Sequence, residues 1–435
     1  MEPRLPGSAA LLEMEARGLL ARLNQIRPLA MQEPMVPAAA LPPRASLDIE
    51  RFLHSGRSVL RRRVQDYIAW LTGPGRQAPP AEQQHRFVLI RMRFNSILSQ
   101  LDMFSEVVTQ RSESRTGIWL SGLDVLADDA LRITPLVTDP LPAVCYLARG
   151  PGAAIRRAKT KMPGGDLSPV AIIRIPRERM VGHGIASSLV HEVGHAGAAL
   201  LGLVESLRKD LAARRPAGAR EQAVWRHWER WISEIVADLW SVATLGISST
   251  LGLLAVVSLP RFFVFRPSGE DPHPTPYVRV LLSCAMGEAF YPHPQWASMR
   301  ATWKALNPVA TLPPGRQQEI AALEAGIPAF VAALLSHRSP GLGGRTLREA
   351  FPTADRVPAR LLQYHDAWRG DIGIMARQRP SLVFAVAGQA RAASRMTPEA
   401  ESQLIGALLR AWALRSTLAS AEQITTHRRV LARAS

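Results

Sequence analysis

Residues 187–196 hold three ionisable side chains at a spacing suited to metal chemistry. His191 and His195 are four residues apart, and Glu192 directly follows the first histidine. On a helix, positions i and i+4 share one face, so both imidazoles can bind a single ion. Glu192 is rotated by about 100° from His191 and remains free to take a proton from water. The pattern predicts a catalytic zinc site, with His191 and His195 as ligands and Glu192 as general base.

The apolar surroundings of this segment favour the metal site over the alternative, a pair of core histidines that happen to flank a glutamate. Leu189, Val190 and Val193 lie between or beside the three ionisable residues. Burying such groups without compensation costs several kcal/mol. Metal coordination supplies that compensation.

A third ligand is expected from residues 231–238. Glu234 and Asp238 lie within about 40° of each other on a helical wheel, off the wide apolar stripe of this segment. Glu234 is the predicted third ligand, and Asp238 is the predicted acceptor that orients a ligating imidazole. The alternatives are that both are ordinary surface acids, or that His227 on the same strip is the ligand instead.

These residues carry a family resemblance. His-Glu-Val-Gly-His at 191–195, followed by Glu-Ile-Val-Ala-Asp at 234–238, resembles the HExxH and ExxxD elements of the gluzincin branch of zinc metallopeptidases. Residues 273–280, HPTPYVRV, are similar to the H-P-x-x-x-x-R-[IV] element of the CAAX prenyl protease and heat-shock membrane protease group. The resemblance covers about 90 residues. It implies hydrolysis of a peptide or protein substrate, with zinc held by His191, His195 and Glu234.

The expected mechanism also needs a donor for the oxyanion besides zinc. In the His-Pro element, His273, Tyr277 and Arg279 are candidates, with His273 and Tyr277 ranked equal. Their alternative role is to hold the loop between two helices. Zinc would lower the pKa of a bound water, and Glu192 would deprotonate it and pass the proton to the leaving amine.

Periodicity and breakers predict a mainly α fold with a small α+β, zincin-like core and helical flanks. The expected regions are a helical N-terminal region (1–115), the metallopeptidase core (116–307) and a helical C-terminal region (308–435). Helices are expected over 8–27, 47–73, 82–112, 183–210 and 218–245, strands over 143–148 and 169–175, and further helices after residue 308.

The formal charge of +17 suggests a nucleic-acid partner, but its distribution argues against one. The excess is +5 in residues 1–115, +5 in 116–305 and +7 in 306–435, so no region concentrates it. Of the 53 basic residues, 49 are arginine. This skew is typical of a GC-rich genome, and we expect a bacterial source.

Composition also bears on the compartment. The N-terminal residues do not read as a signal peptide, and Cys145 and Cys284 are expected as buried free thiols in a reducing cytoplasm. The uncharged residues 239–260 could span a bilayer by length, but a buried helix pair broken near Gly246 is favoured. A non-enzymatic helical scaffold or assembly factor with a structural or vestigial metal site remains the alternative, because the helical flanks carry no catalytic pattern.

Overall fold

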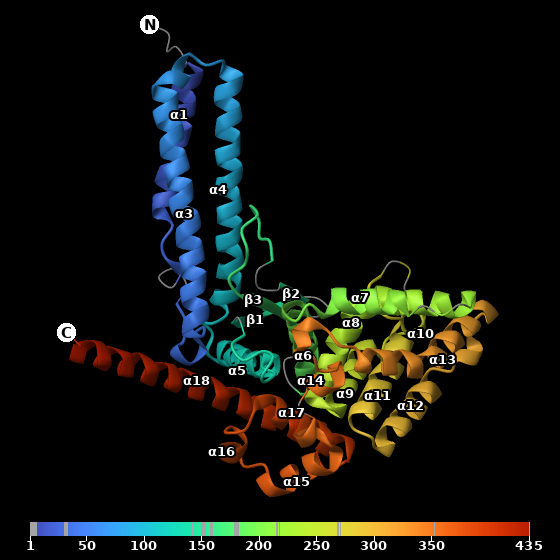
Figure 1. Ribbon diagram of the computed structural model, residues 1–435. Helices are drawn as coiled ribbons and strands as arrows, with labels where there is room; N and C mark the ends of the chain where they lie inside the picture. The colour runs from blue at the N-terminus through green and yellow to red at the C-terminus, as the bar shows by residue number, and fades with distance from the viewer. Residues whose placement is uncertain are drawn as a thin grey trace. The chain divides into compact units, whose positions relative to one another are not determined.

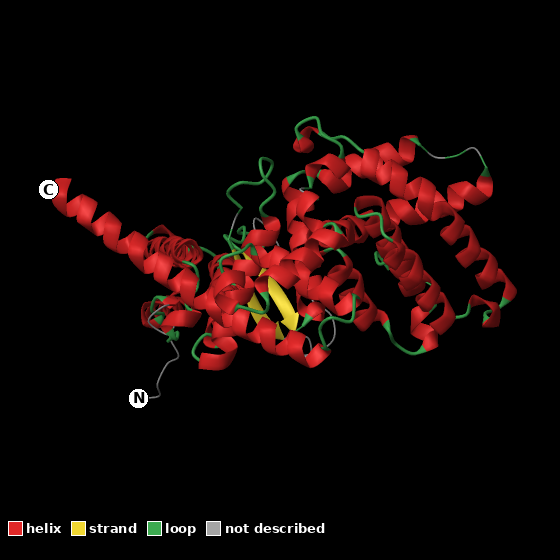
Figure 2. Cartoon of the chain, turned by 90° about the horizontal axis from the view of Figure 1, so that it is seen from below, coloured by secondary structure: helices red, strands yellow, loops and turns green. Residues whose placement is uncertain are grey.

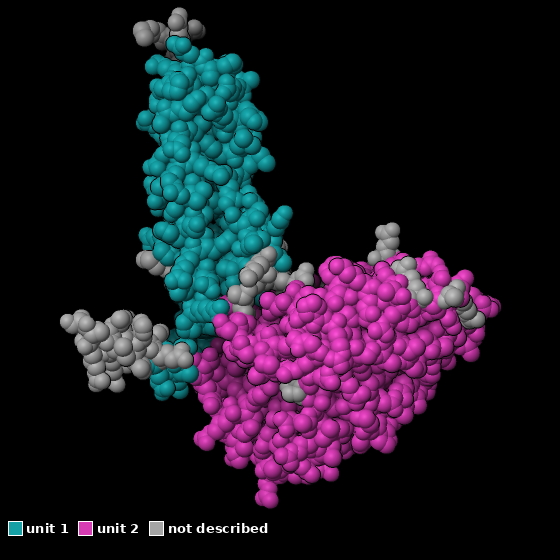
Figure 3. All heavy atoms as spheres, viewed as in Figure 1, with its two compact units in different colours: residues 1–118, 157–171, 417–435 teal, residues 119–156, 172–416 magenta. Residues whose placement is uncertain are grey.

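The computed structural model describes residues 7–29, 34–140, 142–148, 154–156, 160–177, 182–214, 216, 218–267, 269, 271–351 and 353–434. Helices dominate these residues, and the strands are few and short (Figure 2). The mainly helical class with a small sheet agrees with the sequence-based prediction. The chain forms two compact units, residues 1–118, 157–171 and 417–435 and residues 119–156 and 172–416, which Figure 3 colours separately.

The first unit is built around three long helices that lie side by side, α1 (Ser8–Gln25), α3 (Pro43–Thr72) and α4 (Pro80–Thr109) (Figure 1). Each contributes apolar residues at helical spacing to one shared core, which is how an amphipathic helix buries its apolar face. Leu12, Ala16, Leu19 and Leu23 of α1 pack in this way. Gly73, the 3-10 turn Pro74–Gln77 and Pro79 separate α3 from α4 where the sequence predicted a breaker.

The second unit contains the segment with the predicted chemistry. Its first elements are the greater part of α5 (Ser114–Leu131), strands β1 (Ala143–Ala148), β2 (Ala154–Arg156) and β3 (Ala171–Pro176), and helices α6 (His183–Leu200), α7 (Leu203–Ala213), α8 (Ala219–Leu245) and α9 (Ile247–Val257). They are followed by α10 (Arg261–Val264), α11 (Pro276–Phe290), α12 (Pro294–Leu306), α13 (Pro314–Ser336), α14 (Leu347–Ala350), α15 (Pro358–Trp368), α16 (Ile372–Met375), α17 (Pro380–Ala392) and the first part of α18 (Pro398–Ala434).

The strands form one small sheet with the order β1-β3-β2. β2 is antiparallel to β3, with Ala154 opposite Arg174 and Arg156 opposite Ile172. Most residues of β1 and β3 are buried, which matches their nearly continuous apolar sequences. In the order β1-β3-β2, strand β2 lies at one edge of the described sheet, and it packs against α6.

Glycines on α6 allow it to lie very close to α8. A Cβ atom at Gly197 would be 2.1 Å from the Trp240 indole, and one at Gly194 would be 2.9 Å from the backbone of Ala237. Any larger side chain at these positions would push the two helices apart. The close approach is what brings the HExxH segment of α6 next to Glu234 of α8.

Two glycines with positive φ separate successive helices of this unit. Gly202 (φ 61°) separates α6 from α7 inside the expected helix 183–210, and Gly246 (φ 58°) separates α8 from α9. Residues 239–260 thus form a broken helix pair, as favoured from the sequence. By length and hydropathy alone, one helix in the described ranges, α13, could cross a membrane.

The compact units differ from the three regions expected from the sequence. The change of unit after Ile118 lies close to the expected boundary at 115–116, although it falls inside α5. Residues 308–416, in contrast, belong to the same unit as the middle third. The physical reason is that α13 packs on α8 and α11, and α17 packs on α8 and α9, so they share one core.

Candidate metal centre

Helix α6 presents His191 and His195 one turn apart on the same face. Their ring centroids are 4.9 Å apart and the ring planes are nearly perpendicular, at 83°. The helix around them is apolar and largely buried, with Leu189, Val190 and Val193 in the core. The imidazoles are therefore the polar part of an otherwise apolar helix face.

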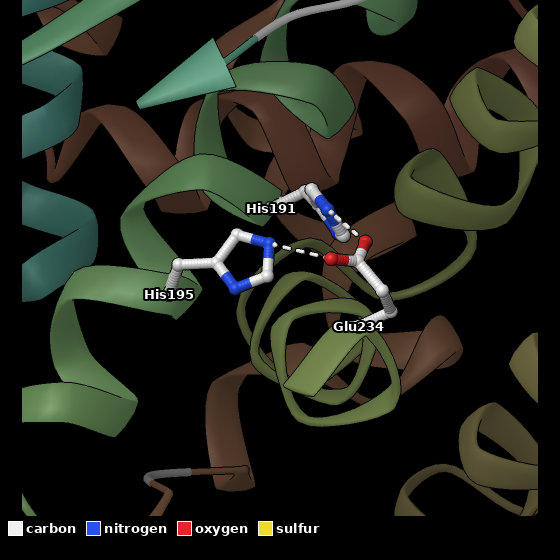
Figure 4. Close-up of side chains that lie close together, drawn as sticks. All are labelled: His191, His195 and Glu234. Carbon is white, nitrogen blue, oxygen red and sulfur yellow. Dashed lines mark ion pairs between the residues drawn. The ribbon is translucent and has the colours of Figure 1, made fainter. Parts of the chain in front are cut away.

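Glu234 of α8 lies opposite both histidines (Figure 4). Its Oε2 is 3.3 Å from Nε2 of His191, and its Oε1 is 3.3 Å from Nε2 of His195. The three residues form a group in which one ligand atom of each lies within 4.8 Å of the others. Helix packing thus brings together the three ligands that the sequence predicted from two separate segments.

The distances between the histidine nitrogens and the Glu234 oxygens fit ligands around one ion better than direct hydrogen bonds. Ligands bound to a tetrahedral zinc ion at about 2.0–2.1 Å lie about 3.3–3.4 Å from one another, whereas a charge-assisted N–H···O bond is about 2.7–2.9 Å long. Moreover, Oε2 of Glu234 is buried and has no hydrogen-bond partner among the described residues. Two imidazoles and a carboxylate are also a ligand set typical of catalytic zinc.

Asp238 orients the first histidine, as predicted. Its Oδ1 lies 2.8 Å from Nδ1 of His191, one turn of α8 beyond Glu234. This hydrogen bond assigns the proton to Nδ1, so the lone pair of Nε2 of His191 can bind a metal, although Nη2 of Arg279 also lies 3.5 Å from that nitrogen. Arg279 of α11 in turn donates to both oxygens of Asp238, from Nε at 2.7 Å and from Nη2 at 2.8 Å.

Charge pairing keeps the buried acids ionised. Burial raises the pKa of Asp238, but the positive charges of Arg279 and His191 outweigh it and hold the pKa at about 2. Burial likewise opposes ionisation of Glu234, but the nearby histidines and the charge of Arg279 outweigh it and lower the pKa of Glu234 well below the usual range. Both carboxylates are therefore negative at neutral pH, as a cation site requires.

Glu192 is buried, at 6% exposure, and lines a cavity of about 290 Å³ together with His191, Asp238 and Arg279. Burial raises its pKa, while the charges of the two histidines act in the opposite direction. One wall of the cavity is apolar and comes from Leu253, Val256, Val257, Leu259 and Phe263. Glu192 thus lies next to the three-residue group, in a space that can hold water or substrate.

His273 also lies at this cavity. Its Nε2 is 3.3 Å from Oε2 of Glu234, and its Nδ1 is 2.7 Å from Oδ1 of Asp271. Its side chain is 44% exposed, so a ligand in the cavity can reach it. With Nδ1 bonded to Asp271, the ring can donate from Nε2 when it is protonated.

Tyr277 and His227 lie elsewhere, and the structure corrects both expectations. Tyr277 is 2% exposed and packs between the rings of Phe265 and Trp303, and burial raises its pKa to about 12. The first turn of α11 directs it into the core because position 277 is on the inner face of that helix. His227 stacks on Trp231, and its buried Nδ1 has no partner in the described chain.

Sequence reasoning did not find the roles of Arg279 and Asp271. Arg279 was named only as an oxyanion donor, whereas it holds Asp238. Its place in the H-P-x-x-x-x-R element was the available signal. Asp271, two residues before His273, had no signal other than its charge.

Comparison of the chain with protein-family models, with curated proteins and with solved structures finds no match.

Proposed function

We propose that the protein is a zinc-dependent metallopeptidase with a gluzincin-like site on a zincin-like core. One observation carries the proposal: Nε2 of His191 and Nε2 of His195 each lie 3.3 Å from a different oxygen of Glu234, with buried Glu192 beside them. This is the spacing of three ligands around one tetrahedral ion, with a carboxylate left for proton transfer.

When bound, zinc would polarise the peptide carbonyl and make a water molecule more acidic. Glu192 would accept the proton of the attacking water and deliver it to the leaving amine. Its burial favours this task because a raised pKa brings a carboxylate closer to the operating pH. Asp238, held by Arg279, would keep Nε2 of His191 directed at the ion.

His273 is the proposed donor to the developing oxyanion. It would donate from Nε2 as an imidazolium, whose positive charge the Asp271 carboxylate at 2.7 Å stabilises. Its partial exposure at the cavity leaves room for the substrate.

A peptide is the proposed substrate. β2 is one of the two edge strands of the described sheet and packs against α6, so an extended chain could add beside it by backbone hydrogen bonds. The apolar cavity wall formed by α9 and α10 would accept an apolar side chain next to the cleaved bond.

The test combines metal content with cleavage of an unfolded protein substrate. Wild-type protein should bind about one zinc ion, and Glu192→Gln should retain the zinc but lose about 10²- to 10⁴-fold in turnover. Glu82→Gln, on the exposed face of α4, is the matched control and should be as active as wild type.

Zinc should also stabilise the wild type against unfolding, by about 2.7 kcal/mol when free zinc is 100-fold above Kd, and His195→Ala should abolish that gain. Zinc bound with no cleavage by wild type would favour the alternative, a scaffold with a structural metal. No zinc binding at all would exclude both.

A further inference from the structure

A second group of chemically complementary side chains lies away from the metal centre. Ser206 and Asp210 are one turn apart on α7, and His337 directly follows α13. Oγ of Ser206 lies 2.9 Å from Nε2 of His337, and Nδ1 of the same ring lies 2.9 Å from Oδ2 of Asp210. A hydroxyl, an imidazole and a carboxylate are thus connected in series by two hydrogen bonds of normal length.

The order of these contacts decides where the protons lie. A carboxylate can only accept, so Nδ1 of His337 carries the proton that it shares with Asp210. Nε2 is then the unprotonated nitrogen in the neutral ring, and the hydroxyl of Ser206 must be the donor. This is the arrangement in which an imidazole acts as a general base toward a serine.

Asp210 is held in its ionised form. Burial raises its pKa, but hydrogen bonds from Arg214 and His337 outweigh this and lower the pKa below its usual value. Nε of Arg214 donates to the other oxygen, Oδ1, at 2.7 Å. The carboxylate therefore keeps both its charge and its orientation toward the ring.

Access differs between the members of the group. His337 is 4% exposed, so its ring is shielded from water, whereas Ser206 is partly exposed on α7. A serine inside a helix commonly donates to the carbonyl one turn earlier. Here the hydroxyl instead lies against Nε2 of His337, so its proton has a basic acceptor on a residue that is partly exposed to solvent.

We propose that Ser206 is a nucleophilic serine that His337 and Asp210 activate toward carboxylic esters, independently of the metal centre. Oγ of Ser206 forms a bond to the ester carbonyl carbon as its proton moves to Nε2 of His337. The bond to the alcohol oxygen then breaks, and the alcohol leaves with that proton. Water repeats the sequence against the acyl-serine, which releases the carboxylic acid and restores the hydroxyl.

A fluorophosphonate probe tests the nucleophile directly. Oγ displaces fluoride from phosphorus, and mass spectrometry of peptides from the labelled full-length protein locates the adduct. We expect the adduct at Ser206 and none at the matched control Ser336, an exposed serine next to His337 whose hydroxyl donates to the Ala333 carbonyl.

Variants separate an activated serine from a structural contact. Labelling should slow by about 10²- to 10⁴-fold in His337→Gln, the contribution typical of a general base, and by a smaller factor in Asp210→Asn. Thermal unfolding identifies variants that do not fold, and Asp210→Asn, at a partly exposed position, replaces His337→Gln if the latter fails. Glu192→Gln should be labelled like wild type.

The same rate at Ser206 and Ser336 in the wild type would overturn the proposal, as would no adduct at all. Unchanged labelling of a folded Asp210→Asn and a folded His337→Gln would also overturn it. None of these outcomes depends on whether the metal centre is active.

Discussion

The guanidinium of Arg279 holds the carboxylate of Asp238 through two hydrogen bonds, at 2.7 and 2.8 Å. The same carboxylate contacts Nδ1 of His191 at 2.8 Å. Arg279 of α11 therefore orients His191 of α6 through Asp238 of α8. Because both members of the ion pair are nearly buried, at 12% and 10% exposure, this connection is rigid, and it can be tested from either end.

At the acidic end, Asp238→Asn should weaken zinc binding by about 10- to 100-fold, the usual effect of removing the group that orients a ligating imidazole. The asparagine side chain has the shape of aspartate but carries no negative charge. Competition with a fluorescent zinc chelator measures the affinity. The control is Asp366→Asn in an exposed ion pair with Arg395, and equal affinities in the two variants would contradict the prediction.

At the basic end, Arg279→Met should destabilise the zinc-free protein by about 3–5 kcal/mol, because it leaves Asp238 charged and buried without its main partner. Arg395→Met breaks a pair of similar length whose side chains are 46% and 61% exposed, and should change the stability little because water screens exposed ion pairs. Chemical denaturation of both variants gives the comparison. Equal losses of unfolding free energy in the two variants would contradict the prediction, because burial of Asp238 would then not affect the stability.

His273 and Tyr277 are equal candidates in the sequence, but we expect their variants to differ if the protein has the proposed activity. His273→Ala should lower kcat by about 10²- to 10³-fold, as for loss of an oxyanion donor, with zinc content unchanged. Tyr277→Phe should leave kcat as in wild type, because its ring lies in the core between Phe265 and Trp303. A lower kcat in Tyr277→Phe would contradict this prediction and would indicate that Tyr277 acts in catalysis.

Two glycines of α6 should respond to alanine in opposite directions. Gly197→Ala places a methyl 2.1 Å from Trp240 and should cost about 1–3 kcal/mol as the helices separate. Gly184→Ala has no atom within 4 Å of the new methyl and should gain up to about 0.5–1 kcal/mol. Thermal unfolding of both variants checks this, and a neutral Gly197→Ala would show that α6 and α8 can move apart freely.

Neither cysteine should react in the folded protein. Cys145 and Cys284 are both buried and free, as expected from the sequence. Burial raises the pKa of the Cys284 thiol to about 12, so at pH 8 only about one thiol in ten thousand is ionised. A chromogenic disulfide reagent should report no reaction in buffer and two thiols in guanidinium chloride. Rapid labelling in buffer would mean that one cysteine is reachable.

Much of the fold could be predicted because helices are encoded locally. The three-to-four-residue spacing of Leu12, Ala16 and Leu19 predicts α1 without any knowledge of its neighbours. Local sequence also indicates where a glycine ends a helix. The predicted helix 183–210 nevertheless continues through Gly202, because a single glycine is often tolerated inside a helix. The sharing of one core by α13, α17 and α8 could not be predicted, since apolar faces do not specify their partners.

The sequence by itself determined which residues can form the metal site. His191, His195, Glu234 and Asp238 follow from helical periodicity, because one turn of a helix places residues four apart on the same face. Only the tertiary structure decided which distant residues join them or stay away. It directs Arg279 to Asp238 and Tyr277 into the core, and it brings His337 to Ser206 across 131 positions of the chain. Such contacts depend on how whole helices pack, and no short sequence pattern records that packing.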